Sequence, residues 1–236
     1  MQIIRDSKGR RTVERNMKDI IGFPSAIYLR NYCKMLMFCY TPLMKEKESI
    51  ILLGIKHSGK TTHGKLLAGH YALPFIDTDF VVEKMTGKSP RILYSEKGSS
   101  SFMIAEENAC RKTAELLEGK SAVIATGGGI CCNPPALMFL RPLGKFVYLY
   151  IPENIAADRI FAKASKTHSG KWENLPAYIA EKEPETEEDC REIFHRFYIE
   201  RSNIYSGIAD CTVELGNNFS SSKDGNLQKI ISALEK

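Results

Sequence analysis

Residues 49–69 read SIILLGIKHSGKTTHGKLLAG, and this stretch decides the fold. Residues 50–53 are a short apolar run rich in β-branched side chains, which predicts a buried strand of a parallel sheet. The run passes into residues 54–61, which have the pattern G-x-x-x-x-G-K-[ST] of a phosphate-binding loop. Residues 62–68 then predict a helix. This order predicts a chain that binds a nucleoside triphosphate, or that derives from one that did.

The positions of the loop have separate physical roles. Gly54 and Gly59 accept backbone angles and close approaches that a Cβ atom would block. The amides of the loop and of the helix N-terminus offer partial positive charge to phosphate oxygens. Lys60 adds a full charge near the β- and γ-phosphates, and the Thr61 hydroxyl can bind Mg²⁺. We therefore expect ATP and Mg²⁺ as cofactors, with ATP contacting Gly54, His57, Ser58, Gly59, Lys60, Thr61 and Thr62.

Further apolar runs alternate with helical patterns along the chain. They predict strands at 74–77, 122–125, 146–151 and 211–215. The helical pattern over 90–117 is interrupted near Gly98, which predicts two helices joined by a hinge. Strands that alternate with helices predict an α/β fold with a doubly wound parallel sheet. Ligands of such sheets bind beyond the carboxyl ends of the strands.

Two groups of residues follow predicted strand ends, on the same rim as the phosphate-binding loop. Asp77 and Asp79 are two residues apart, so one carboxylate can organise Mg²⁺ while the other takes a proton from an attacking hydroxyl. Both could instead be turn or cap residues. Gly127, Gly128 and Gly129 present bare amides and leave room for a small ligand. Beside a phosphate-binding loop, these groups favour a phosphoryl-transfer site.

Residues 50–215 resemble the shikimate kinase family, a small member of the nucleoside-monophosphate-kinase-like fold. The resemblance rests on the loop and on FIDTD at 75–79, EKMTG at 83–87, Phe102-x-x-x-Glu106-Glu107, TGGG at 126–129, VYL at 147–149, and Arg201-x-x-x-Tyr205 followed by Ala209-Asp210. It implies a P-loop three-layer sandwich with a five-stranded parallel sheet. It also implies a mobile lid over about residues 163–183, in a kinase domain spanning 49–236.

On the nucleotide side, the resemblance implies that Asp77 organises Mg²⁺ together with Thr61. Lys60 would be the phosphate clamp and a catalytic residue, and Arg159 would lie near the adenine.

On the acceptor side, the resemblance implies that Asp79 holds the substrate hydroxyls and acts as the catalytic base. Gly127, Gly128 and Gly129 would line the pocket, and Arg201 would pair with the substrate carboxylate. The implied reaction transfers the γ-phosphate of ATP to the 3-hydroxyl of shikimate.

The sequence departs from the family pattern at three places. Met103 stands where an arginine usually shares the substrate carboxylate with Arg201. The lid stretch 172–176, WENLP, lacks an arginine that normally reaches the transferred phosphate, and His57 replaces a glycine of the loop. Each missing charge-assisted contact is worth ~1.5–3 kcal/mol. Two other interpretations therefore stay open: a kinase of this fold with another hydroxylated acceptor, and a nucleotide-binding module that has lost turnover.

Composition limits the partners. The net charge of +5 is explained by an anionic substrate as readily as by nucleic acid. The seven cysteines include no C-x-x-C pair, so neither a disulfide framework nor a zinc site is indicated, and Cys131 and Cys132 are expected to be incidental neighbours at a helix start. We expect a cytoplasmic monomer that acts on a small molecule such as shikimate, with no nucleic-acid or membrane partner.

Residues 1–48 precede the predicted domain as a basic and amphipathic extension. Their apolar patch at 26–40 is too short and too charged to span a bilayer, and no secretory cleavage site follows it. We expect an amphipathic helix that packs on the domain. The alternatives are a basic arm for a partner and a start codon placed too early, with the true start at Met35, Met37 or Met44.

Overall fold

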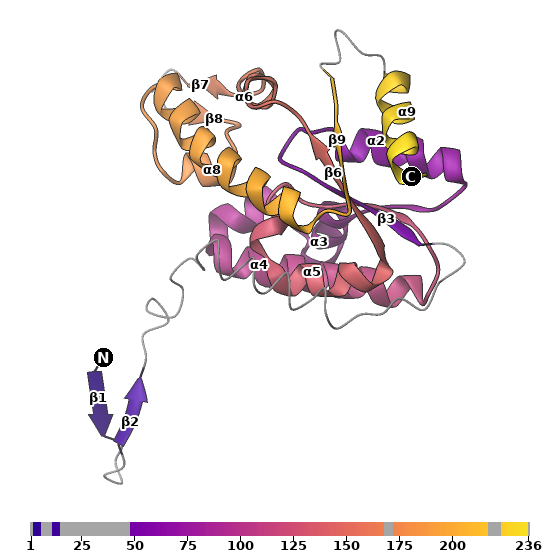
Figure 1. Cartoon of the computed structure of the whole chain (residues 1–236). Coiled ribbons are helices and arrows are strands. Elements are labelled where there is room, and N and C mark those ends of the chain that lie inside the picture. Colours follow the sequence, from indigo (N-terminus) through magenta and orange to yellow (C-terminus); the bar gives the residue numbers. More distant parts are fainter. Residues whose placement is uncertain (1, 6–10, 15–47, 168–171, 217–222, 236) are drawn as a thin grey trace. The chain divides into compact units, whose positions relative to one another are not determined.

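The computed structural model describes residues 2–5, 11–14, 48–167, 172–216 and 223–235 (Figure 1). The chain divides into two compact units, Met1–Cys39 and Tyr40–Lys236. In the first unit, β1 (Gln2–Arg5) and β2 (Arg11–Glu14) pair antiparallel, which the sequence did not predict. The amphipathic helix expected at 26–40 lies outside the described residues, and the boundary between 48 and 49 stays a prediction.

The second unit is built on a parallel sheet of five strands in the order β4-β5-β3-β6-β9. The strands are β3 (Ser49–Leu53), β4 (Phe75–Asp77), β5 (Val123–Ala125), β6 (Gly144–Tyr150) and β9 (Cys211–Glu214). All five predicted strands and the parallel arrangement are confirmed. Every residue of the central strand β3 is buried, as expected for a strand covered on both faces.

Helices cover both faces of this sheet. In Figure 1, α2 and α9 lie on one side, and α3, α4 and α5 lie on the other, which confirms the predicted three layers. The helical segments are α2 (Lys60–Tyr71), α3 (Thr78–Thr86), α4 (Pro90–Leu117), η2 (Ile130–Cys132), α5 (Pro134–Leu140), η3 (Arg141–Leu143), α6 (Glu153–Phe161), α7 (Ala177–Ala180), α8 (Glu187–Ile208) and α9 (Lys223–Leu234). Among the residues described, no helix is both long and apolar enough to span a bilayer.

Helix α4 is interrupted where the sequence predicted a hinge. Gly98 takes φ 77° and ψ 174°, which is incompatible with a helix and favours glycine. The Ser89 side chain accepts a hydrogen bond from the amide of Ile92 and caps the first half. The predicted pair of helices is therefore confirmed, and the two halves meet at a kink.

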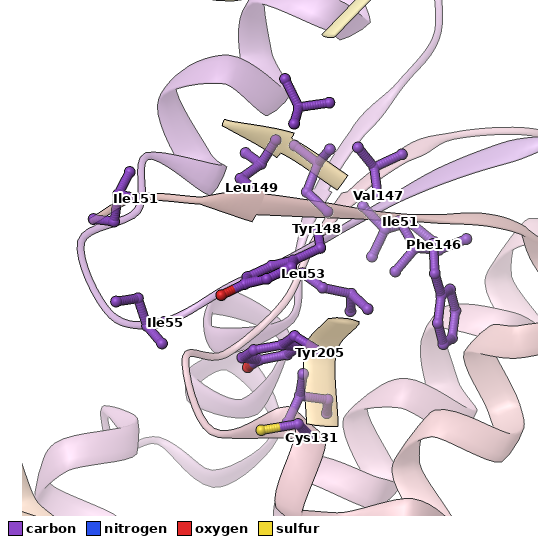
Figure 2. Packing of buried hydrophobic residues seen from close by; sticks show 14 of the residues in the cluster. Ile51, Leu53, Ile55, Cys131, Phe146, Val147, Tyr148, Leu149, Ile151 and Tyr205 are labelled. Carbon is purple, nitrogen blue, oxygen red and sulfur yellow. The ribbon is translucent and has the colours of Figure 1, made fainter. Parts of the chain in front are cut away.

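Aromatic packing fixes helix α8 to the sheet. The ring of Tyr148, from β6, stacks on that of Tyr205, from α8, with centroids 5.2 Å apart (Figure 2). The Tyr148 hydroxyl also donates to Ser202 Oγ at 3.1 Å. In Figure 2, Cys131 lies beside Tyr205 in the same buried cluster. Arg201 lies one helical turn before Tyr205, so this packing also sets the position of its side chain.

The predicted lid contains more regular structure than the sequence suggested. β7 (Ser165–Lys166) and β8 (Trp172–Glu173) pair antiparallel, and α7 follows. Leu175 and Ile179 are fully buried in the main core, so the end of this segment is anchored to the domain. The mobility of the lid stays a prediction.

Gly144 allows β6 to begin directly against β3. A Cβ atom at this position would overlap the carbonyl oxygen of Ser49 and lie 2.5 Å from its amide nitrogen. We expect Gly144→Ala to lower the free energy of unfolding by about 1–3 kcal/mol, because backbone must shift to admit the methyl group. Urea denaturation followed by circular dichroism measures this change.

Gly69→Ala is the matched control, because a Cβ atom there meets nothing within 4 Å and the position is helical. It should leave the stability unchanged or raise it by up to ~1 kcal/mol. A Gly144→Ala protein as stable as the parent would contradict the packing described.

Candidate active site

The phosphate-binding loop joins β3 to α2 and depends on unusual backbone angles. Gly54 has φ 146°, and a Cβ atom there would lie 2.8 Å from the carbonyl oxygen of Leu149. Gly59, at φ 97°, caps the N-terminus of α2. His57 also takes a positive φ of 64°, although it is not a glycine. His57, which stands where the resembled family has a glycine, thus keeps the left-handed backbone conformation that glycine adopts at no steric cost.

Lys60 is folded into this loop. Its Nζ donates to the carbonyl oxygens of Gly54 at 2.7 Å and Ile55 at 2.9 Å. The side chain is buried, and burial lowers the pKa of Lys60 to about 8 against the opposing effect of Asp79 and Asp77. The loop therefore presents a desolvated ammonium group on the cavity side of the sheet.

The two predicted carboxylates follow β4, next to the first turn of α2. Thr61 Oγ1 donates to Asp77 Oδ2 at 2.8 Å. Asp77 Oδ1 accepts from the amide of Asp79 at 3.1 Å and so caps helix α3. The Thr61 hydroxyl and the Asp77 carboxylate thus lie side by side. Magnesium usually keeps several waters and takes one or two protein oxygens besides phosphate, so this pair fits such an ion.

A cavity of about 770 Å³ opens beside the loop. Several predicted site residues line it: His57, Gly59, Lys60, Thr61, Thr62, Asp77, Asp79, Gly128 and Arg159. Gly54, Ser58, Gly127, Gly129 and Arg201 lie outside this lining. Arg159 donates to the carbonyl oxygen of His57 at 2.9 Å, which ties α6 to the loop.

Two further lysines, Lys56 and Lys163, line the cavity and were not predicted. Lys56 could have been found as a basic residue inside the loop motif, whereas Lys163 was noticed only as the start of the lid. With Lys60 and Arg159 they surround His57. Burial, followed by these cations, lowers the pKa of His57 to about 4, so its imidazole is neutral at pH 7.

The three glycines after β5 connect the remaining predicted residues. A Cβ atom on Gly127 would lie 2.9 Å from Asp79 Oδ1, and one on Gly128 would lie 2.7 Å from the amide nitrogen of Lys56. The corresponding position on Gly129 is 3.6 Å from a terminal nitrogen of Arg201. The glycines therefore touch the expected base, the phosphate-binding loop and the expected carboxylate partner in turn.

Arg201 is held between aromatic rings. Its guanidinium carbon lies 4.3 Å from the ring centroid of Tyr178 and 5.1 Å from that of Phe197. One terminal nitrogen donates to the carbonyl oxygen of Gly128 at 3.5 Å. Within the described part of the chain, its buried Nε has no hydrogen-bond partner. No local sequence pattern predicted these two rings, because they come from different helices, α7 and α8.

A second guanidinium reaches the lid from the start of α4. Arg91 donates to Asn174 Oδ1 at 3.2 Å and to the carbonyl oxygen of Leu175 at 2.9 Å. These residues belong to the stretch in which the sequence lacks an arginine. Arg91 also lowers the pKa of Lys56, second to burial, which places its charge near the cavity. Sequence reasoning missed this residue because it is far from the lid in the chain.

Two carboxyl groups face Gly127. Burial, followed by the charge of Asp77, raises the pKa of Asp79, and Lys60 and Lys56 oppose this effect. The other carboxyl belongs to Glu106, whose Oε1 would lie 2.8 Å from a Cβ atom on Gly127. Glu106 is 2% exposed, and burial raises its pKa to about 7. The sequence showed Glu106 only as part of the family pattern.

The raised pKa of Glu106 has a consequence for stability. The folded protein holds this proton more tightly than the unfolded chain, where the ordinary value is 4.5. The stabilisation is complete below the unfolded pKa and is lost as the pH rises towards about 7. Relative to Glu106→Gln, the parent should lose about 3 kcal/mol of unfolding free energy over this range. Urea denaturation of both proteins at several pH values measures it, and a difference independent of pH would contradict it.

Comparisons with known proteins identify relatives of this chain. The family model for shikimate kinase matches residues 56–234. A shikimate kinase from Chlorobium chlorochromatii is 34% identical over 124 residues, which are 52% of this chain and 64% of that protein, less than two thirds of its length. One from Pelotomaculum thermopropionicum is 33% identical over 140 residues, or 58% of this chain and 79% of that protein.

A solved structure shows the same fold. The shikimate kinase from Acinetobacter baumannii in complex with shikimate has a TM-score of 0.64 and 24% identity, and the match covers 81% of this chain and 94% of that one. The family match begins at residue 56, inside the loop, and spans the rest of the loop, the carboxylates, the glycines and Arg201 together. The chain belongs to the shikimate kinase family.

Proposed function

We propose that this chain is an ATP-dependent kinase that transfers the γ-phosphate of ATP to the 3-hydroxyl of shikimate. The observation that carries the proposal is that Lys60, Asp77 and Asp79 line one cavity, while Gly127 and Gly129 connect Asp79 with Arg201. Phosphoryl transfer requires chiefly positioning and charge stabilisation. The cavity supplies both beside a carboxylate that can accept a proton.

In this proposal, Asp79 holds the acceptor hydroxyl and takes its proton as the bond from the acceptor oxygen to the γ-phosphorus forms. The bond from that phosphorus to the oxygen bridging the β- and γ-phosphates breaks, and ADP leaves. Lys60 moves its ammonium group from the loop carbonyls to the β- and γ-phosphates. Thr61 and Asp77 hold Mg²⁺, which when bound neutralises charge on the phosphates. Arg159 lies on the nucleotide side, where it orders the loop through His57.

Two cations lie near the cavity or the lid segment that lacks an arginine. Lys56 lines the cavity, and Arg91 contacts the lid at Asn174 and Leu175. We propose that their charges partly compensate for the missing guanidinium near the transferred phosphate. A lysine cannot reproduce a bidentate contact, so the compensation is electrostatic rather than geometric.

We also propose that the protein acts as a cytoplasmic monomer on small molecules, without a nucleic-acid or membrane partner. In support, all five cysteines in the described part of the chain are free thiols, which suits a reducing compartment.

Asp79→Asn tests the proposed base. The change removes the proton acceptor but keeps the shape of the side chain. We expect kcat with ATP and shikimate to fall by about 10²–10⁴-fold, while the Kd for ATP changes little. Coupled ADP release and mass spectrometry of the shikimate product measure turnover, and calorimetry measures ATP binding. Asp224→Asn, an exposed change in α9, is the control. Full activity of Asp79→Asn would contradict the assignment, and no transfer to shikimate by the parent would contradict the function.

Arg201→Ala tests the proposed carboxylate partner. A charge-assisted contact made in the ground and transition states alike affects mainly KM. We expect KM for shikimate to rise about 10–100-fold with a smaller change in kcat. Arg196→Ala on the same helix is the control, because Arg196 is exposed and pairs with Glu192. An unchanged KM would show that the acceptor carboxylate binds elsewhere.

A further inference from the structure

Glu106 has a buried carboxyl group, and its two oxygens differ in their hydrogen bonding. Oε2 accepts a hydrogen bond from Asn133 Nδ2 at 2.9 Å, and the same nitrogen donates to the carbonyl oxygen of Met103 at 2.9 Å. This contact fixes the carboxyl on α4. Among the described residues, Oε1 has no hydrogen-bond partner, although it is fully buried. It is directed at Gly127, beside Asp79.

Charged and titratable groups face Glu106 from several elements. Asp79 at the start of α3 and the Cys132 thiol in η2 disfavour its ionisation, whereas Arg201 of α8 favours it. Cys110 lies on the same helix and is buried. Burial outweighs all of these groups and holds the pKa of Glu106 at about 7, so a large share of the carboxyls carry a proton at neutral pH.

The side chain at position 103 explains why a proton on Glu106 would matter for binding an anion. Met103 lies one helical turn before Glu106 and cannot donate a hydrogen bond to an anion. An ionised Glu106 would add a second negative charge beside Asp79, against an anionic acceptor. A protonated Glu106 removes that charge and turns the unused Oε1 into an O–H donor.

We propose that Glu106 is a specificity-determining residue of the acceptor site: its neutral carboxyl donates from Oε1 to an oxygen of a carboxylated, hydroxylated acceptor above Gly127. The inference rests on the proposed function, because it requires such an acceptor beside Arg201. A consequence is that acceptor binding takes up a proton whenever Glu106 is ionised in the free protein.

Calorimetric titration with shikimate from pH 6 to pH 8.5 tests the inference. Above the pKa of the free carboxyl, binding weakens up to tenfold per pH unit, so the parent Kd should be about tenfold higher at pH 8 than at pH 6. Measurements in buffers of different ionisation enthalpy should show uptake of close to one proton at pH 8. Glu106→Gln keeps a donor without a titratable group, so its Kd should be nearly constant and its proton uptake absent.

Three controls separate Glu106 from its neighbours. Glu107→Gln removes the same charge from the adjacent position and should keep the parent behaviour. Cys132→Ser should also keep it, although hydrogen bonding to Cys131 lowers the pKa of Cys132 to about 7. Met103→Arg places a cation one turn from Glu106, which should ionise the carboxyl and abolish the proton uptake while tightening shikimate binding. This variant keeps the inference testable if Glu106→Gln does not fold.

The outcomes distinguish this inference from the proposed function. Shikimate binding with the same pH dependence in the parent and in Glu106→Gln overturns the role of Glu106 alone. Loss of the pH dependence in Cys132→Ser overturns it as well, because the thiol would then be the titrating group. Failure of every variant to bind shikimate at any pH contradicts the proposed function, and this inference with it.

Discussion

The close approach of two backbones at Gly128 is the constraint on which the candidate site depends. A side chain at this position would meet the amide nitrogen of Lys56 at 2.7 Å, so only a hydrogen atom fits between the loops that follow β5 and β3. These strands are neighbours in the sheet, and their loops leave it at the same edge. The contact therefore joins the phosphate-binding loop to the glycines that lead towards Arg201, and places the two substrates of the proposed reaction within reach of each other.

Charge is concentrated around this contact. Four cations line one cavity (Lys56, Lys60, Lys163 and Arg159), against three carboxylates (Asp77, Asp79 and Asp158). Desolvation lowers the pKa values of Lys56 and Lys60, so burying these two ammonium groups costs free energy in the unliganded protein. A polyanion such as a triphosphate would offset that cost on binding. The cavity is thus built for a ligand of high negative charge rather than for a neutral one.

The sequence allowed the fold and the position of the phosphate-binding loop to be predicted, because both depend on local patterns. Apolar runs marked the five strands, and the spacing of Gly54, Gly59 and Lys60 marked the loop. The acceptor side was predictable only in part. The glycines were found from their place after a predicted strand, and Arg201 through a resemblance. The rings of Tyr178 and Phe197 and the contact of Arg91 with the lid arise from tertiary packing. No local pattern shows that Glu106 has an oxygen without a partner, since this depends on what surrounds it in three dimensions.

The kink at Gly98 separates helix α4 into two halves that contact different parts of the protein. The half before it carries Arg91 and Tyr94, whose side chains bond to Leu175 and Glu181 in the predicted lid. The half after it carries Met103 and Glu106, which are held by Asn133. Because a glycine with a positive φ separates the two halves, a change in one half does not pass rigidly along a helix axis to the other. The residues that contact the predicted lid and those beside the proposed acceptor site can therefore change independently. Substitutions can accumulate in one half of α4 while the geometry of the other half is retained.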